Sequence, residues 1–170
     1  NIKYRIIGGL SFYQRREIKH LLAYLRFSIN HNDEEALKRV INLPKRGVGP
    51  GTMNKVVVTA YEEQKGLWEV LNQIRDIASG RAVQGVIDFI NLIKRFEVEI
   101  ARKDAYEAAN LIARESGLLK ELYEDKTIEG LSRYENVQEL LNAIKEFVDR
   151  EDNEDKSLSS FLQEVALITS

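Results

Sequence analysis

Several residue types that build catalytic and metal sites are absent or rare in this chain of 170 residues. There is no cysteine, which excludes disulfide bonds and thiolate sites and fits a reducing compartment. The only two histidines, His20 and His31, have no carboxylate or thiol partners at metal-ligand spacing, so no metal site is expected. The residues also offer no serine–histidine–acid arrangement. The sequence therefore predicts no covalent catalysis.

Long apolar runs and nucleotide-binding motifs are missing as well. No run reaches the roughly 18 apolar residues of a membrane span, so no membrane partner is expected. The pattern G-x-x-x-x-G-K-[ST] is absent, so the chain by itself is not expected to be an enzyme. Residues 1–5 contain neither an initiator methionine nor an apolar signal core. We expect the chain to be an internal piece of a longer protein.

What the chain has is a folded composition with an uneven distribution of charge. It is 44% hydrophobic and 31% charged, with a net charge of −2. Residues 1–61 carry 11 lysines and arginines against 4 acids, whereas residues 62–170 carry 14 against 23. This asymmetry favours one surface that faces an anion, such as nucleic acid, and one solvated surface. The alternative is that helical proteins often segregate charge without function.

Apolar residues recur at helical spacing along most of the chain, and the fold class predicted is mainly α, an irregular multi-helix bundle. One short strand is predicted at 3–7, before a Gly-Gly turn. Residues 124–130 are predicted to be a loop, and 149–155 a solvated linker. Helices are predicted over 12–29, 34–41, 52–63, 67–78, 81–101, 105–115, 118–123, 131–148 and 158–168.

The stretch 43–52 (LPKRGVGPGT) holds both prolines of the chain, three glycines and two adjacent cations. It predicts a tight turn between two helices, with Pro50 as a first helical residue. Exposed N–H groups beside Lys45 and Arg46 would suit a phosphate. An ordinary helix connector with a solubilising Lys-Arg pair remains the alternative. No acid occurs in 36–61.

Two further features have both a functional and a structural interpretation. Arg15, Arg16 and Lys19 cluster in the first turns of a predicted helix, where cations oppose the helix dipole. An anionic partner explains them, and so does a solvated face or pairing with Glu17. The single tryptophan, Trp68, is predicted to be a core anchor rather than a stacking platform.

Four blocks in order resemble superfamily 1 DNA helicases of the UvrD/Rep/PcrA type. Residues 4–19 (YRIIGGLSFYQRREIK) are similar to the family's Y-R-[IV]-x-G-G-x-x-F-[FY]-x-R-x-E-I-K, and 42–49 (NLPKRGVG) to its N-x-P-x-R-G-[IV]-G. Residues 133–140 (RYENVQEL) resemble R-x-E-N-[IVL]-x-E-L, and 157–167 (SLSSFLQEVAL) resemble S-L-x-x-F-L-x-E-[VA]-A-L. His20 departs from the family, which usually has Asp there.

The resemblance implies a domain organisation. Residues 1–29 look like a flank of the second RecA-like (2A) domain, 30–156 like the helical accessory (2B) subdomain, and 157–170 like the returning helix of 2A. Hinges are then expected at 29–32 and 149–156. The parent would be an ATP-dependent 3′-to-5′ DNA helicase of repair or replication that uses ATP and Mg²⁺, in the cytoplasm (the bacterial nucleoid). No cofactor is expected in this piece.

The resemblance also implies site residues. The turn resembles a helix–hairpin–helix element that touches duplex DNA, with Gly47 and Gly49 allowing positive φ. Such contacts reach the backbone and read no bases. The expected partners are double-stranded DNA, single/double-strand junctions and the other helicase domains. The predicted duplex-binding residues are Lys45, Arg46, Gly47, Val48, Gly49, Thr52 and Lys55.

A second set, Arg15, Arg16 and Lys19, is assigned to a single-strand or interdomain contact. Glu135 and Asn136 are interpreted as organising helix packing. Two rival functions stay open at this point: a free-standing helix–hairpin–helix DNA-binding module, and a helical protein-interaction scaffold whose acidic half is the contact surface.

Overall fold

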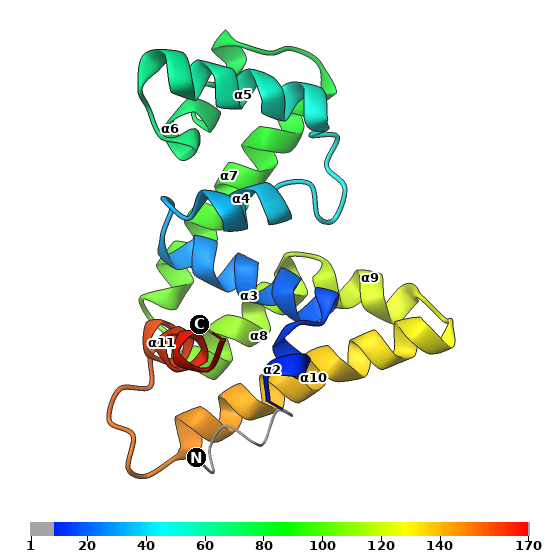
Figure 1. The fold of residues 1–170 in the computed structure, drawn as a ribbon, viewed down its shortest axis with the longest axis vertical. Helices are drawn as coiled ribbons and strands as arrows, with labels where there is room; N and C mark the ends of the chain where they lie inside the picture. Colours follow the sequence, from blue (N-terminus) through cyan, green and yellow to red (C-terminus); the bar gives the residue numbers. More distant parts are fainter. Residues whose placement is uncertain (1–8, 170) are drawn as a thin grey trace.

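The structure, a computed structural model, describes residues 9–169. All regular structure in this range is helical, which confirms the mainly α prediction, and the helices stack into an elongated body (Figure 1). The strand predicted at 3–7 lies outside the described residues. The elements are α2 (Leu10–Tyr13), α3 (Arg16–Ile29), α4 (Glu34–Val40), α5 (Pro50–Glu63), α6 (Leu67–Leu71), η1 (Ile74–Asp76), α7 (Arg81–Ile100), α8 (Ala105–Glu115), α9 (Leu118–Glu124), α10 (Ile128–Asp149) and α11 (Leu158–Thr169).

Helix α3 lies at the centre of the core. Its stripe of Ile18, Leu21 and Leu25 is fully buried. It packs against α4, α7, α8 and α10, and more lightly against α2 and α11. Because α3 touches most of the other helices, it organises the body. The flank boundary at residue 29 that the resemblance implies would therefore fall at the end of this buried central helix.

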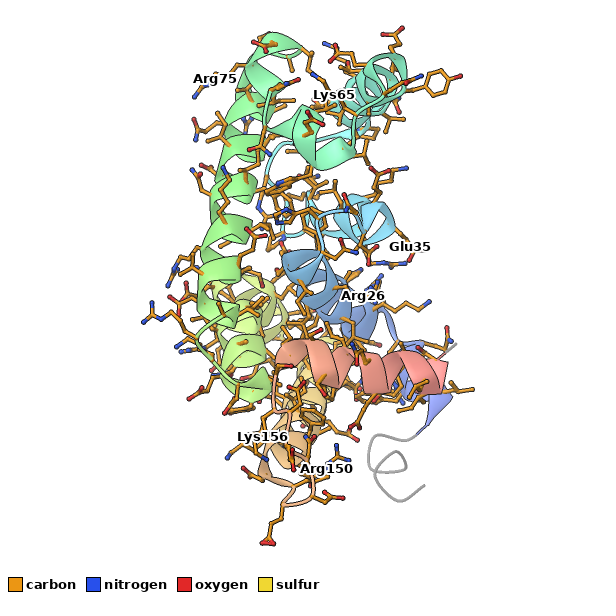
Figure 2. The ribbon with its side chains drawn as sticks, turned by 90° about the vertical axis from the view of Figure 1, so that its left-hand side faces the viewer. Arg26, Glu35, Lys65, Arg75, Arg150 and Lys156 are labelled. Atoms are coloured by element: carbon orange, nitrogen blue, oxygen red, sulfur yellow. The ribbon has the colours of Figure 1, made fainter. Side chains whose placement is uncertain are left out.

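Helix α7 runs along the body as a second long support. Phe89, Ile93 and Phe96 are fully buried and recur at the spacing of one helical face. At one end of the body lie α5, α6 and η1, where Figure 2 labels Lys65 and Arg75. Arg150 and Lys156, which precede α11, lie at the opposite end (Figure 2). The turn between α4 and α5 thus lies away from the segment that leads into α11.

Several boundaries differ from the sequence prediction for local reasons. The helix predicted over 12–29 is interrupted because Arg15 is extended, with φ −68° and ψ 138°. The helix predicted over 67–78 breaks into α6 and η1, where Asn72 donates its side-chain amide to the carbonyl of Trp68 at 2.8 Å. Helix α5 ends at Glu63 as predicted, and Gln64 after it takes the left-handed conformation, with φ 54°.

The loop predicted at 124–130 is shorter than expected, because Thr127 begins α10 early. Its hydroxyl accepts from the N–H of Gly130 at 2.9 Å, an N-cap that the sequence prediction missed. Side chains also cap the starts of α4 and α8. Asp33 accepts from Ala36 N–H at 3.1 Å, and Asp104 forms a capping box with Glu107.

Two absences hold for the described part of the chain. No helix within 9–169 has both the length and the apolar character needed to cross a membrane. Nor do the histidines and carboxylates of the same residues gather into a group of three that could hold a metal ion.

Candidate nucleic-acid interface

The turn between α4 and α5, residues 41–49, is held by one side chain. Asn42 accepts with Oδ1 from the backbone N–H of Arg46 at 2.6 Å and from that of Val48 at 3.1 Å. Gly47 lies between these two residues with φ +81°, a conformation that favours glycine. Val48 is only 2% exposed and enters the core. Lys45 and Gly47 are left exposed on the outside of the turn.

Arg46 points inward, and its guanidinium donates hydrogen bonds to carbonyl oxygens at the end of α4. Its Nη1 donates to the carbonyl oxygens of Val40, Ile41 and Leu43 at 3.1, 3.0 and 3.3 Å. The last carbonyls of a helix lack intrahelical donors, and a cation there also complements the helix dipole. The guanidinium also lies 5.2 Å from the centre of the Phe89 ring. The side chain therefore stabilises the turn from within.

Tyr24 of α3 completes this arrangement. Its hydroxyl accepts from Arg46 Nη2 at 2.6 Å and donates to the carbonyl of Leu43. Burial raises the pKa of the Tyr24 hydroxyl, although the nearby Arg46 charge opposes the rise. The phenol therefore stays protonated at neutral pH and links the turn to the central helix.

Two glycines of other elements let the turn approach closely. A Cβ on Gly85 of α7 would lie 2.1 Å from the carbonyl oxygen of Arg46, so only glycine fits without a shift. A Cβ on Gly117, between α8 and α9, would lie 3.0 Å from Cγ of Pro44. The turn is thus braced by α3, α7 and the α8–α9 junction.

The first turn of α5 adds backbone donors beside Lys45. Gly49 is the N-cap, extended at φ −90°, and it offers no side chain to accept a hydrogen bond. Pro50 is the first helical residue, as predicted. The N–H groups of Gly51 and Thr52 belong to the donors that lack intrahelical acceptors at a helix start. Such a helix start favours a bound anion.

The structure separates the predicted site residues into three groups. Lys45, Gly47 and Lys55 are exposed, Gly49 and Thr52 are partly exposed, and Val48 and the guanidinium of Arg46 face inward. Positive φ occurs at Gly47 but not at Gly49, which corrects the expectation for the second glycine. The predicted cation pair therefore presents one charge outward, at Lys45.

The second predicted set lies at the beginning of α3. Arg15 and Arg16 are exposed and Lys19 is partly exposed. Burial, Arg39 and Arg16 lower the pKa of His20, with Glu17 acting in the opposite direction. Arg16 and Arg39, from two different helices, therefore both disfavour the charged form of His20.

Asn136 has the packing role expected of it. Its side-chain amide donates to Oε2 of Glu17 at 2.8 Å, and Glu17 is 8% exposed. This hydrogen bond joins α10 to α3 and pairs a buried carboxylate. Glu135, the neighbouring motif residue, is exposed.

One exposed cation next to the turn was missed by the sequence analysis. Arg81 begins α7, and a Cβ on Gly47 would lie 4.0 Å from the Arg81 Cβ. A surface depression of about 430 Å³ lies here, lined by Lys45, Arg46, Arg81, Gln84, Gly85 and Asp88. The available signal was a cation at a helix start, the same signal that drew attention to Arg15 and Arg16.

Comparison with known proteins identifies the family of this chain. The model of the UvrD-like helicase C-terminal domain matches residues 1–170. The ATP-dependent DNA helicases PcrA of Staphylococcus aureus (strain COL) and of Staphylococcus epidermidis are each 34% identical over 169 residues, covering 99% of this chain. The chain spans 23% of the length of these curated relatives. It belongs to the UvrD-like helicase C-terminal domain family, as a piece of a UvrD/PcrA-type helicase.

Proposed function

We propose that this chain is the helical accessory (2B) part of an ATP-dependent 3′-to-5′ DNA helicase. In this proposal the turn at 41–49 and the start of α5 bind the backbone of duplex DNA, including duplex at a single/double-strand junction. Binding there regulates unwinding by the parent protein. The relatives are ATP-dependent DNA helicases by name, which supports ATP and Mg²⁺ use by the other domains of the parent.

The observation that carries the proposal is the outward face of the turn. The turn and the first turn of α5 together contain the exposed Lys45, Gly47 without a side chain, and the N–H groups of Gly51 and Thr52. No acid occurs in 36–61. A phosphate requires a cation and directed N–H donors, and this face offers both. Backbone donors and a lysine contact phosphate oxygens rather than base edges, so the expected binding is independent of sequence.

Arg46 takes a different role in this proposal from the direct contact expected from its sequence position. With Nη1 on three carbonyls and Nη2 on Tyr24, its charge is already hydrogen-bonded inside the protein. We therefore assign Arg46 to positioning: it holds the shape of the turn that presents Lys45 and Gly47. Lys55, one and a half turns into α5, is a further exposed cation of this part of the chain.

The packing also bears on where the accessory part begins. The predicted hinge at 29–32 is spanned by an ion pair of 3.2 Å between Arg26 and Asp33, and α3 lies in the core. At 149–156, Lys156 Nζ donates to the carbonyls of Val148 and Arg150. These contacts support a rigid body that includes α3, with its N-terminal boundary near the break at Arg15.

The test is binding of a fluorescent DNA duplex of mixed sequence across a salt series. For the wild-type chain we expect non-specific affinity on the order of 10⁻⁴ to 10⁻⁶ M at physiological salt. Lys45→Ala should flatten the log–log salt slope by about 0.9. Gly47→Val should weaken binding by distorting the turn.

Lys94→Ala is the matched control, because Lys94 is an exposed lysine on α7 away from the turn. If Lys45→Ala and Lys94→Ala bind duplex equally well, the turn is not the interface. If the wild-type chain binds no duplex even at low salt, the proposed function itself fails.

A second candidate function, docking of a protein partner, is favoured by one observation. At the junction of α9 and α10, Tyr123, Ile128 and Leu131 are 61%, 85% and 57% exposed, beside the acids Glu124 and Glu129. Exposed apolar side chains in an acidic setting suit a basic amphipathic segment. If this surface docks a protein in addition to the DNA site, Ile128→Ser should leave duplex binding unchanged. If the chain is instead a scaffold without DNA function, it should bind no duplex at any salt.

A further inference from the structure

Arg81 occupies a position that helix stability does not explain. It is the first residue of α7, where a cation opposes the helix dipole, and its N-cap Gly80 supplies no side-chain hydrogen bond. Its side chain is exposed, so it does not serve the core. A role outside the helix, toward an anion, accounts for an arginine at this position.

The position of Arg81 relative to the turn is fixed by close packing. A Cβ on Gly47 would lie 4.0 Å from both the Cβ and the carbonyl oxygen of Arg81. Gly85, one helical turn further along α7, packs directly against the carbonyl of Arg46. Because the turn rests directly on α7, the exposed cations Lys45 and Arg81 border one depression.

The charges around this depression favour an anion at its outer rim. The lining residues contribute Lys45, Arg46 and Arg81 against one acid, Asp88. Asp88 accepts from the side-chain amide of Gln84 at 2.8 Å, one turn earlier on the same helix. Arg46 lies beneath the rim, with its guanidinium on carbonyl oxygens, and adds positive potential without reaching outward.

We propose that Arg81 is a second phosphate-binding residue of the duplex site, and that Lys45 and Arg81 hold the DNA backbone between the turn and the start of α7. This inference rests on the proposed function above and deepens it. The pair that contacts phosphate is then Lys45 and Arg81, which come from two elements, rather than the adjacent residues Lys45 and Arg46.

Salt dependence of duplex binding tests this pairing in the 170-residue chain. Each lost phosphate contact removes about 0.9 from the log–log slope. Arg81→Ala should therefore flatten the slope by about 0.9 and weaken binding by roughly 5-fold at low salt. Lys45→Ala/Arg81→Ala should flatten it by about 1.8. Arg81→Lys keeps the charge and should restore the wild-type slope.

Arg102→Ala is the matched control, since Arg102 is exposed and follows the opposite end of α7, about 30 Å away. It should leave slope and affinity unchanged. Arg81→Ala should melt at or slightly above the wild-type temperature, because alanine is a better residue than a cation at an exposed helix start. If Arg81→Ala matches Arg102→Ala while Lys45→Ala weakens binding, the assignment of Arg81 is wrong and the proposed function stands. If neither the wild-type chain nor any variant binds duplex, the proposed function itself is wrong.

Discussion

Two helix-to-helix connections in this molecule are built on opposite plans. The turn at 41–49 joins α4 to α5, and the connection at 125–127 joins α9 to α10. Each connection packs against a glycine so closely that a Cβ would not fit there. A Cβ on Gly85 would lie 2.1 Å from the carbonyl oxygen of Arg46, and a Cβ on Gly130 would lie 2.3 Å from Cγ of Asp125. The first glycine belongs to a distant helix and the second follows its own turn closely in sequence.

The consequences of this difference appear in the side chains. The first turn sends Val48 and the Arg46 guanidinium into the body and is braced by Tyr24 of α3. The second is held by local hydrogen bonds, in which Thr127 donates to Asp125 and thereby lowers the pKa of that carboxyl. The long-range contacts hold the backbone of the first turn in place, with Lys45 exposed on its outside. Beside the second turn, which is held by local hydrogen bonds, the apolar Ile128 is exposed.

The largest expected effect comes from removing the inward brace of the first turn. Arg46→Ala leaves the carbonyls of Val40, Ile41 and Leu43 without their donor, so we expect a loss of about 3 kcal/mol in the free energy of unfolding. Urea denaturation measures this change. Lys45→Ala, which removes an exposed neighbouring cation, should stay within about 0.5 kcal/mol of wild type. Equal losses for the two variants would contradict the inward role of Arg46.

Substituting two glycines of the same stretch should give effects of opposite sign. Gly47→Ala forces a Cβ into a left-handed conformation and should destabilise by about 1 to 2 kcal/mol, although no atom lies nearer than 4.0 Å. Gly51→Ala lies in α5 with nothing within 4 Å, so alanine should stabilise by about 0.5 kcal/mol. Thermal melting of both variants checks the signs. A stabilising Gly47→Ala is the outcome that contradicts the observed turn conformation.

Much of this architecture could be predicted from the sequence because its signals are local. The periodic stripe of α7, the capping box at Asp104 and Pro50 as first residue of α5 depend on neighbours within one or two helical turns. The resemblance to the helicase family is confirmed by the family match.

What escaped prediction depends on contacts that are distant in sequence. The inward direction of Arg46 requires Tyr24 and Phe89, which come from two other helices. The adjacency of Arg81 to Gly47 exists only once α7 packs beneath the turn. Charge counting along the chain therefore drew attention to the stretch 43–52, but it could not tell an outward cation from an inward one.

The contact between α10 and α3 tests whether the body is held together independently of the turn. Asn136→Ala should leave the buried Glu17 carboxylate without its amide donor and lower the free energy of unfolding by about 1 to 2 kcal/mol. Its neighbour Glu135 is exposed, and Glu135→Ala should change stability by less than about 0.5 kcal/mol. Chemical denaturation distinguishes the two, and an effect of similar size at Glu135 would argue against the packing role of Asn136. Duplex binding by Asn136→Ala should be unchanged in the folded protein.

The smallest expected effect concerns His20, the residue that departs from the family pattern in the basic half of the molecule. Burial, Arg39 and Arg16 lower its pKa in the folded protein, whereas Glu17 opposes the shift. The unfolded chain therefore takes up a proton more readily, and the stability that depends on neutral His20 is lost as the pH falls below its unfolded value of about 6.5. His20→Gln should remove this part of the pH dependence between about pH 7 and 5.

His20→Asp reverses the sign of the interaction with the same two arginines. An aspartate at position 20 should interact favourably with Arg16 and Arg39 and stabilise by about 0.5 kcal/mol at low ionic strength, reduced by the Glu17 charge and largely screened near 1 M salt. Urea midpoints at two salt concentrations measure the difference. A stabilisation that persists at high salt would have to come from packing instead. Loss of stability at low salt would show that repulsion by Glu17 outweighs attraction by the two arginines at position 20. The electrostatic potential there would then be less positive than the charge count of residues 1–61 suggests.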